Sequence, residues 1–270
     1  MCPVPAAAQG IVIRQDVGPW VQHFTVLSAN AAVGALTGGI LQALRGGSFA
    51  DGFTRGAVGG ALVYAGKRVA AEPPWGAGML GREIAAVGTS VVRNAAAGRP
   101  SFERLSLPLG PLPVWLVIEQ TPRVSIRPTL DLSAAIWVGS NLSDQRLSLD
   151  VAQSFSAGAP VFNAELRAIR SGDDIAQGVM VSRTITLSDP LTGYPSDPAR
   201  TLAHERVHVI QSDFALSAWG ASVTDAVMGR LPLGGFVSRW LLLDWFQLFP
   251  WDPGGANDPW EEEATFFSRP

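Results

Sequence analysis

The residues from Thr201 to His208 contain the motif HExxH, and this is the part of the chain whose spacing specifies a reaction. In a helix His204 and His208 stand four residues apart, so both imidazoles leave the same face and can bind one metal ion. Glu205 lies beside them, where its carboxylate can act as a general base on a water molecule. The motif predicts a zinc site, and the alternative is a pair of solvated histidines on an ordinary helix.

The motif needs a helix to position it, and its flanks carry helix signals. Asp197 is suited to cap a helix, and Pro198 to its first turn. Apolar residues follow at spacings compatible with one buried stripe, namely Leu202, Val209, Ile210, Phe214 and Leu216. We therefore expect a helix that begins near Pro198 and ends before Gly220.

A catalytic zinc site needs a third protein ligand and an open position for water. The extended motif HExxHxxGxxH fails, because Gln211 stands in place of the glycine and Phe214 in place of the third histidine. The remaining histidine of the chain, His23, lies beside Trp20 and Phe24, which indicates a packed or interfacial histidine. The acidic run from Glu261 to Glu263 is the better source. Its alternative is a solvated first turn of a helix, where carboxylates interact well with the helix dipole.

At these residues the chain resembles the gluzincin branch of zinc metallopeptidases, in which a Glu on a later helix, in an ExxA(D) pattern, completes HExxH. Glu261 stands three residues before Ala264 and matches the ligand position. The resemblance implies a zinc ion held by the two motif histidines and Glu261, with Glu262 as the second choice. It makes Glu263 either a residue that supports the ligands or a solvated one.

The stretch from Leu202 to Gln211 also resembles the HExxHxxQ helices of several bacterial peptidase-like domains. Both resemblances cover only this helix and the acidic segment. Thr265 departs from the family, since an Asp that orients a histidine ligand often follows the Ala. Tyr194, just before the helix, is one of two tyrosines, but neither it nor another residue can be assigned as a transition-state stabiliser.

The resemblance implies a zinc metalloendopeptidase with a peptide or protein substrate. Zinc on His204, His208 and Glu261 would activate water and polarise the scissile carbonyl, while Glu205 would accept a proton and pass it to the leaving amine. One alternative is a catalytically inactive structural or binding protein of the cell envelope with a degenerate site. Another is an adhesion module in which HExxH is incidental.

Composition indicates contact with a membrane. Hydrophobic residues make up 47% of the 270 residues, and charged residues make up 16%, below the roughly 25% of soluble domains. The net charge of −3 and the lack of a basic cluster exclude nucleic acid as a partner. The single cysteine, Cys2, excludes an internal disulfide and a cysteine-based metal site.

Residues 1–110 form a block rich in Gly and Ala, for which we expect helices, possible membrane association and localisation to a membrane or the cell envelope. The segment from Phe24 to Leu44 has no charged residue and is long enough to span a bilayer. Gly52, Gly56 and Gly60 form a GxxxGxxxG series that lets two helices approach closely, in lipid or in a soluble domain. A further helix is expected at 81–97.

Residues 111–190 alternate between apolar and polar side chains, which indicates strands. We expect strands at 113–119 and 124–138, then runs through 147–155 and 179–187, joined as an antiparallel β-meander. An edge strand of this sheet beside the metal helix could align an extended peptide. Residues 191–270 form the metal-binding helical part, in which a Trp-rich segment at 234–251 is suited to an apolar interface or an aromatic core. The fold class is α+β with a zincin-like C-terminal part.

Overall fold

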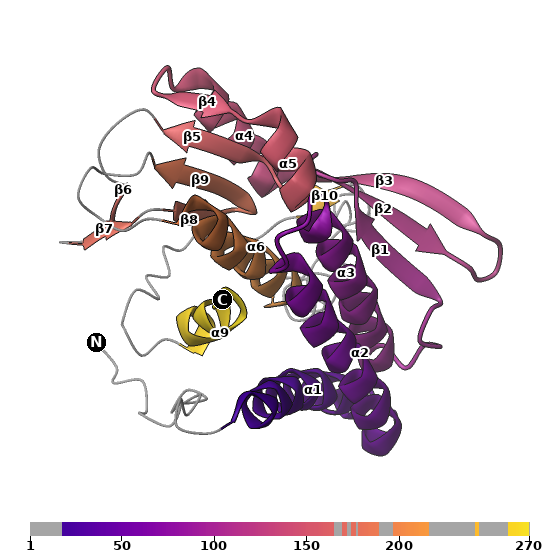
Figure 1. Cartoon of the computed structure of the whole chain (residues 1–270). Coiled ribbons are helices and arrows are strands. Elements are labelled where there is room, and N and C mark those ends of the chain that lie inside the picture. Colours follow the sequence, from indigo (N-terminus) through magenta and orange to yellow (C-terminus); the bar gives the residue numbers. More distant parts are fainter. Residues whose placement is uncertain are drawn as a thin grey trace, which may run out of the picture.

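The computed structural model describes residues 18–164, 169–171, 174–176, 178–188, 197–215, 241–242 and 259–269. Helices and strands are mixed along the chain, which confirms an α+β protein at this coarse level. Figure 1 shows long helices below and two sheets above them. Helix α6 runs diagonally between the two parts.

The N-terminal block consists of three long helices, α1 (Pro19–Leu44), α2 (Phe49–Ala70) and α3 (Ala77–Ala96). They pack through rows of glycine, as the GxxxGxxxG spacing predicts. A Cβ atom added to Gly56 would overlap the backbone of Gly34 on α1, and one added to Gly66 would overlap Gly81 on α3. Helix α2 is therefore in backbone contact with a neighbour on each side, and neither contact leaves room for a side chain.

The first sheet has the order β1-β2-β3-β10. Strands β1 (Arg104–Pro108), β2 (Val114–Glu119) and β3 (Ser125–Asp131) are antiparallel, and the two residues of β10 (Leu241–Leu242) run parallel to β3. The strand expected at 113–119 is β2.

The prediction of one long strand at 124–138 is wrong beyond Asp131, where β3 ends. Helix α4 (Leu132–Ser143) begins there, because the carboxylate of Asp131 accepts a hydrogen bond from the backbone N–H of Ala134 at 3.1 Å and caps the first turn. The alternation of apolar and polar residues continues into this helix, where Ile136 is exposed.

The second sheet has the order β4-β5-β9-β8. Its strands are β4 (Leu147–Leu149), β5 (Val161–Ala164), β8 (Gly178–Val181) and β9 (Thr184–Ser188), and a separate two-stranded ribbon contains β6 (Ile169–Ser171) and β7 (Asp174–Ala176). Strands β5 and β9 are parallel, so the single antiparallel meander is wrong.

Two of the expected runs in this region also divide into separate elements. The run through 147–155 contains helix α5 (Val151–Ala157), which Asp150 caps through the N–H of Gln153. The run at 179–187 is a hairpin of β8 and β9. Its turn residues Ser182 and Arg183 both have positive φ, a conformation that their residue types do not signal.

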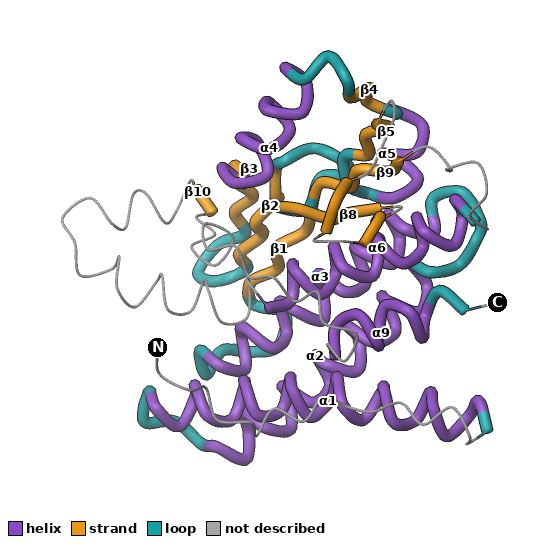
Figure 2. The backbone as a smooth tube through the Cα atoms, turned by 90° about the vertical axis from the view of Figure 1, so that its left-hand side faces the viewer, coloured by secondary structure: helices purple, strands orange, loops and turns teal. Residues whose placement is uncertain are grey.

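Helix α6 (Pro198–Ala215) carries HExxH and begins where the sequence predicts, with the carboxylate of Asp197 accepting from the N–H of Ala199 at 3.1 Å. Figure 2 places α6 between the strands on one side and helices α1 and α9 (Pro259–Phe267) on the other. Apolar side chains of α6 enter three separate core clusters, with α2 and α3, with the second sheet, and with α1 and α9. The motif helix is thus the central element of the described fold.

The close approach of α1 and α2 can be tested at Gly56. We expect Gly56→Ala to lower the free energy of unfolding by about 1–3 kcal/mol, because the added methyl group overlaps backbone that cannot move aside. The matched control is Gly139→Ala in α4, where an added Cβ meets no atom and the helix should gain about 0.4–1 kcal/mol. Chemical denaturation measures both, and equal effects would contradict the packing described.

Candidate metal centre

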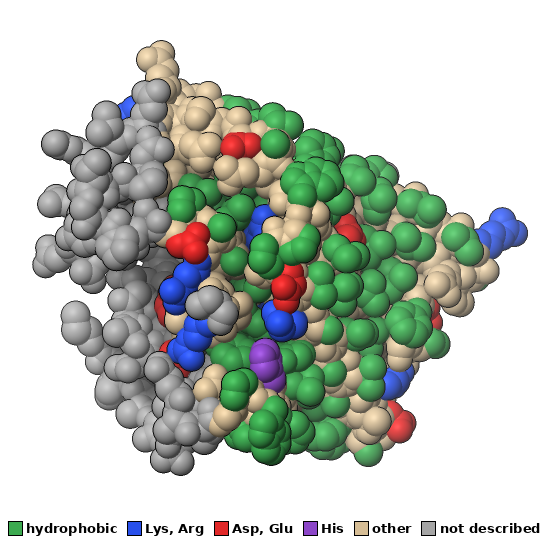
Figure 3. Space-filling view, viewed as in Figure 1, with side chains coloured by type: hydrophobic (Ala, Val, Ile, Leu, Met, Phe, Trp, Pro, Cys, Tyr) green, Lys and Arg blue, Asp and Glu red, His purple; other side chains and the backbone are tan. Residues whose placement is uncertain are grey.

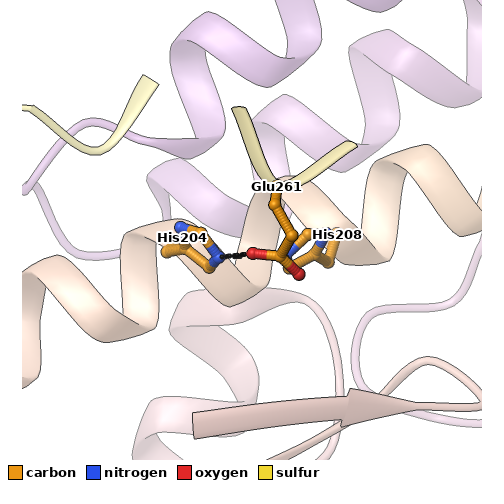
Figure 4. Close-up of side chains that lie close together, drawn as sticks. All are labelled: His204, His208 and Glu261. Carbon is orange, nitrogen blue, oxygen red and sulfur yellow. Dashed lines mark hydrogen bonds and ion pairs between the residues drawn. The ribbon is translucent and has the colours of Figure 1, made fainter. Parts of the chain in front are cut away.

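Three side chains from two helices meet at the surface of α6. His204 and His208 extend from successive turns of α6, and Glu261, in the first turn of α9, lies between them (Figure 4). One carboxylate oxygen of Glu261 is 3.1 Å from Nε2 of His204 and the other is 3.2 Å from Nε2 of His208. The two Nε2 atoms are 2.9 Å apart. The structure thus brings together the three residues that the sequence predicts as ligands.

The donor atoms match what a zinc ion requires. Ligands of a tetrahedral zinc ion lie about 3.3 Å from one another, which follows from metal–ligand distances near 2.0–2.1 Å. The three distances here are within a few tenths of an ångström of that spacing, with each oxygen of Glu261 facing one of the two imidazoles. Two imidazole nitrogens and a carboxylate also suit zinc better than Ca²⁺ or Mg²⁺, which prefer sets of oxygen ligands.

The cluster is open to solvent on one side. The side chain of Glu261 is 43% exposed, and those of His204 and His208 are 21% and 13% exposed. Three protein ligands in a partly exposed position leave room for a fourth ligand from solution. This geometry is typical of a catalytic zinc site, whereas structural sites have four protein ligands.

Electrostatics tie the three groups to one another. Hydrogen bonds from His204 and His208 hold the pKa of Glu261 well below its usual range, although burial opposes this shift. Burial alone would lower the pKa of His208, but its hydrogen bond to Glu261 and the negative charges of Glu205 and Glu261 raise it. The carboxylate of Glu261 and the imidazole of His208 therefore stabilise one another's charged forms.

Glu205 is buried beside the cluster, and burial raises the pKa of its carboxyl group above the ordinary value. The positive charges of His208 and His204 oppose this shift, and the negative charge of Glu261 adds to it. The carboxylate lies against strand β8, where a Cβ atom on Gly178 would come within 3.0 Å of Oε1 of Glu205. The glycine therefore leaves space for the carboxyl group between α6 and the sheet.

The other two carboxylates of the acidic run differ from Glu261. Glu262 is not part of the cluster, and its Oε2 is buried with no hydrogen-bond partner in the described structure. Glu263 points into the protein, where it forms an ion pair with Lys67, so its interpretation as a solvated residue is wrong. It also accepts a hydrogen bond from Gln211, which in turn contacts His208.

His23 is a packed residue, as expected. Its Nδ1 is 2.8 Å from the hydroxyl of Tyr64, and its ring meets Phe266 of α9 edge to face. His23 is therefore not part of the His204–His208–Glu261 cluster and belongs to the contacts that hold α9. Tyr194 and the Trp-rich segment at 234–251, apart from the two residues of β10, lie outside the described residues.

Several supporting residues were not predicted from the sequence. Gln211 could have been found, because it stands three residues after His208 and so shares its helix face. Lys67 also carried a signal, since it is the only lysine among 20 basic residues. No local pattern marks Asp213, which forms buried ion pairs with Arg82 of α3 and Arg183 of the β8–β9 turn. These ion pairs attach the last turn of α6 to helix α3 and to the β8–β9 turn.

Comparisons with known proteins do not assign the chain. No family model matches it, and the searches of curated proteins and of solved structures give no match.

The choice of Glu261 as the third ligand can be tested against its neighbour. We expect Glu261→Gln to weaken zinc binding by at least about 10-fold, because a neutral amide oxygen replaces a charged ligand between the two imidazoles. The control Glu262→Gln changes the same charge one residue away and should bind zinc as the wild type does. Competition with a chromogenic chelator measures both affinities, and the opposite order would reassign the ligand to Glu262.

Proposed function

We propose that this protein is a zinc-dependent, metallopeptidase-like hydrolase of the gluzincin type. The observation that carries the proposal is the position of the Glu261 carboxylate, which reaches both imidazoles of HExxH from a helix 57 residues away in sequence. A solvated acidic helix start gives no reason for one carboxylate to turn towards two histidines. The proposed ligands are His204, His208 and Glu261, and the proposed general base is Glu205.

The residues of the chain support a hydrolytic mechanism. Zinc, when bound, lowers the pKa of a coordinated water towards neutrality and polarises a carbonyl group. Glu205 accepts the proton of the attacking water, and its raised pKa suits it both to take this proton and to return it. The same carboxyl group then delivers the proton to the leaving amine. The carboxylate of Glu205 is buried against Gly178, which keeps it away from bulk solvent.

Strand β8 supports a peptide as the substrate class. It is the last strand in the described order of the second sheet, and it passes directly beside Glu205. An edge strand offers unpaired backbone groups, to which an extended peptide can add as a further strand. A peptide held in this way would run past the metal ligands with its carbonyl groups at regular spacing.

Helix α1 supports the proposal that the protein contacts a membrane. It contains no Asp, Glu, Lys or Arg, and by length and composition it is able to cross a bilayer, although core helices of soluble proteins share these properties. Figure 3 shows hydrophobic side chains over much of one face of the molecule, with charged side chains in small groups. The exposed hydrophobic side chains of α1 include Trp20, Phe24, Leu36 and Leu44. We place the protein at a membrane or in the cell envelope.

Membrane contact is tested by flotation with phospholipid vesicles. Wild-type protein should float, and Leu36→Glu combined with Leu44→Glu should remain in the dense fraction, because both charges face outward from α1. The matched control is Val124→Glu with Ile126→Glu, at exposed apolar positions near β3. Wild-type protein that does not float contradicts this localisation.

The role of Glu205 separates the hydrolase from its main alternative, an envelope binding protein with an inactive site. We expect Glu205→Gln to reduce cleavage of an unfolded protein substrate by about 10²–10⁴-fold, because no general base remains, while zinc content stays at one ion per chain. Glu72→Gln, at a surface carboxylate, should keep full activity. Zinc-loaded wild-type protein that cleaves no peptide bond would favour the binding protein.

A further inference from the structure

A continuous chain of polar contacts leads from the candidate metal centre into the N-terminal helices. Nδ1 of His208 is 2.7 Å from Oε1 of Gln211, and Nε2 of Gln211 donates to Glu263 at 2.8 Å and to the carbonyl of Trp260 at 3.0 Å. Two acceptors at the amide nitrogen fix the orientation of the Gln211 side chain. Its oxygen can then only accept from His208, so Nδ1 carries a proton and Nε2 is the nitrogen available to a metal ion.

The chain ends at a buried cation. Nζ of Lys67 on α2 donates to Oε2 of Glu263 at 2.7 Å and to Oδ1 of Asn30 at 2.9 Å. The amide nitrogen of Asn30 on α1 donates to the other oxygen of Glu263 at 2.6 Å. The side chain of Lys67 is only 4% exposed and that of Glu263 is 16% exposed, so the two groups form a buried ion pair, which is costly to break.

The identity of the cation supports a specific role. Every other basic residue among the 20 is an arginine, and the one lysine occupies this position between Asn30 and Glu263. A compact ammonium group with three donors fits between the amide and the carboxylate, where the planar guanidinium of arginine is larger. The carboxylate of Glu263 accepts three hydrogen bonds, from Asn30, Lys67 and Gln211.

Glu263 also stands two residues after Glu261 on the same nine-residue helix. Glu261 is too exposed to be held by burial, so its position depends on how α9 is fixed. Ala264, Phe266 and Phe267 fix the apolar side of α9 in a cluster with α1 and α6. The bonds of Glu263 to Lys67 and Asn30 fix its polar side, next to the predicted ligand.

We infer that Lys67 and Gln211 are positioning residues of the metal centre: Lys67 holds α9, and with it Glu261, through Glu263, and Gln211 orients His208. The inference rests on the proposed function only in requiring that the site binds zinc. It makes the α1–α2 hairpin part of the metal centre, although Lys67 and Glu263 are 196 positions apart in the chain.

The test compares two neighbouring cations of α2. Lys67→Met should weaken zinc binding by about 10- to 100-fold, the usual effect of losing a contact behind the ligands. Arg68→Met removes the same charge from an exposed surface pair with Glu72 and should leave the zinc affinity unchanged. Competition with a chelator gives the affinity, and unfolding of the metal-free proteins gives their stability separately. A role in folding alone would lower that stability and leave the affinity of the folded protein as it is.

Gln211→Met keeps the size of the side chain but cannot accept from His208, and it carries the test if Lys67→Met does not fold. The same weakening of zinc binding is expected, with a changed visible spectrum of the cobalt-substituted protein.

Selective isotope labelling of lysine gives one reporter resonance, at Lys67, which should shift on zinc addition to the wild type. Wild-type zinc affinity in the folded variants would overturn the inference and leave the proposed function intact. A wild-type protein that binds no zinc would overturn both.

Discussion

The attachment of α9 to α6 is the interaction on which the site depends. Without it, HExxH has two imidazoles on one helix and no third ligand. The attachment has a polar side, where Glu261 meets the histidines and Glu263 meets Lys67, and an apolar side that contains Val207 of the motif helix. The two carboxylates, two residues apart, thus have different roles. Glu261 faces the histidines at the partly exposed site, and Glu263 faces Lys67 in the protein interior.

The opposite side of α6 is fixed by a second set of buried charges. Asp213 is paired with Arg82 and Arg183, and Arg183 also pairs with Asp131 at the start of α4. Both guanidinium groups lie over the ring of Trp115 in β2, at 5.5 and 5.8 Å from its centre. Buried ion pairs add little net stability but are costly to break, so they fix the relative positions of helix and sheets. The motif helix is therefore held rigidly where the chemistry requires it.

Local signals in the sequence predicted the elements that depend on local chemistry. The helix of HExxH, its cap at Asp197 and the close packing at Gly56 all follow from residue types at fixed spacing. The selection of Glu261 from three adjacent carboxylates came from a family pattern, because nothing local distinguishes them. The strands were predicted less well, since an Asp cap at Asp131 and a turn at Ser182 outweighed an alternating pattern that by itself does not end a strand.

The supporting network could not be predicted, because its members come from α1, α2, α6 and α9 and meet only in the folded chain. The glycines of the N-terminal helices nevertheless contribute to this network. Because they let α1 and α2 approach closely, Asn30 and Lys67 come together against Glu263. The same helices that supply an apolar surface thus supply the cation behind the ligands. The proposed membrane contact and the proposed metal binding would then depend on the same helices.

The central claim is that three side chains from α6 and α9 bind one zinc ion. The most direct measurement is anomalous diffraction at the zinc absorption edge from crystals of the protein with zinc. The account predicts one strong peak about 2.0–2.2 Å from Nε2 of His204, Nε2 of His208 and a carboxylate oxygen of Glu261. A zinc-loaded crystal without a peak between these side chains, or with the peak on other residues, would contradict it.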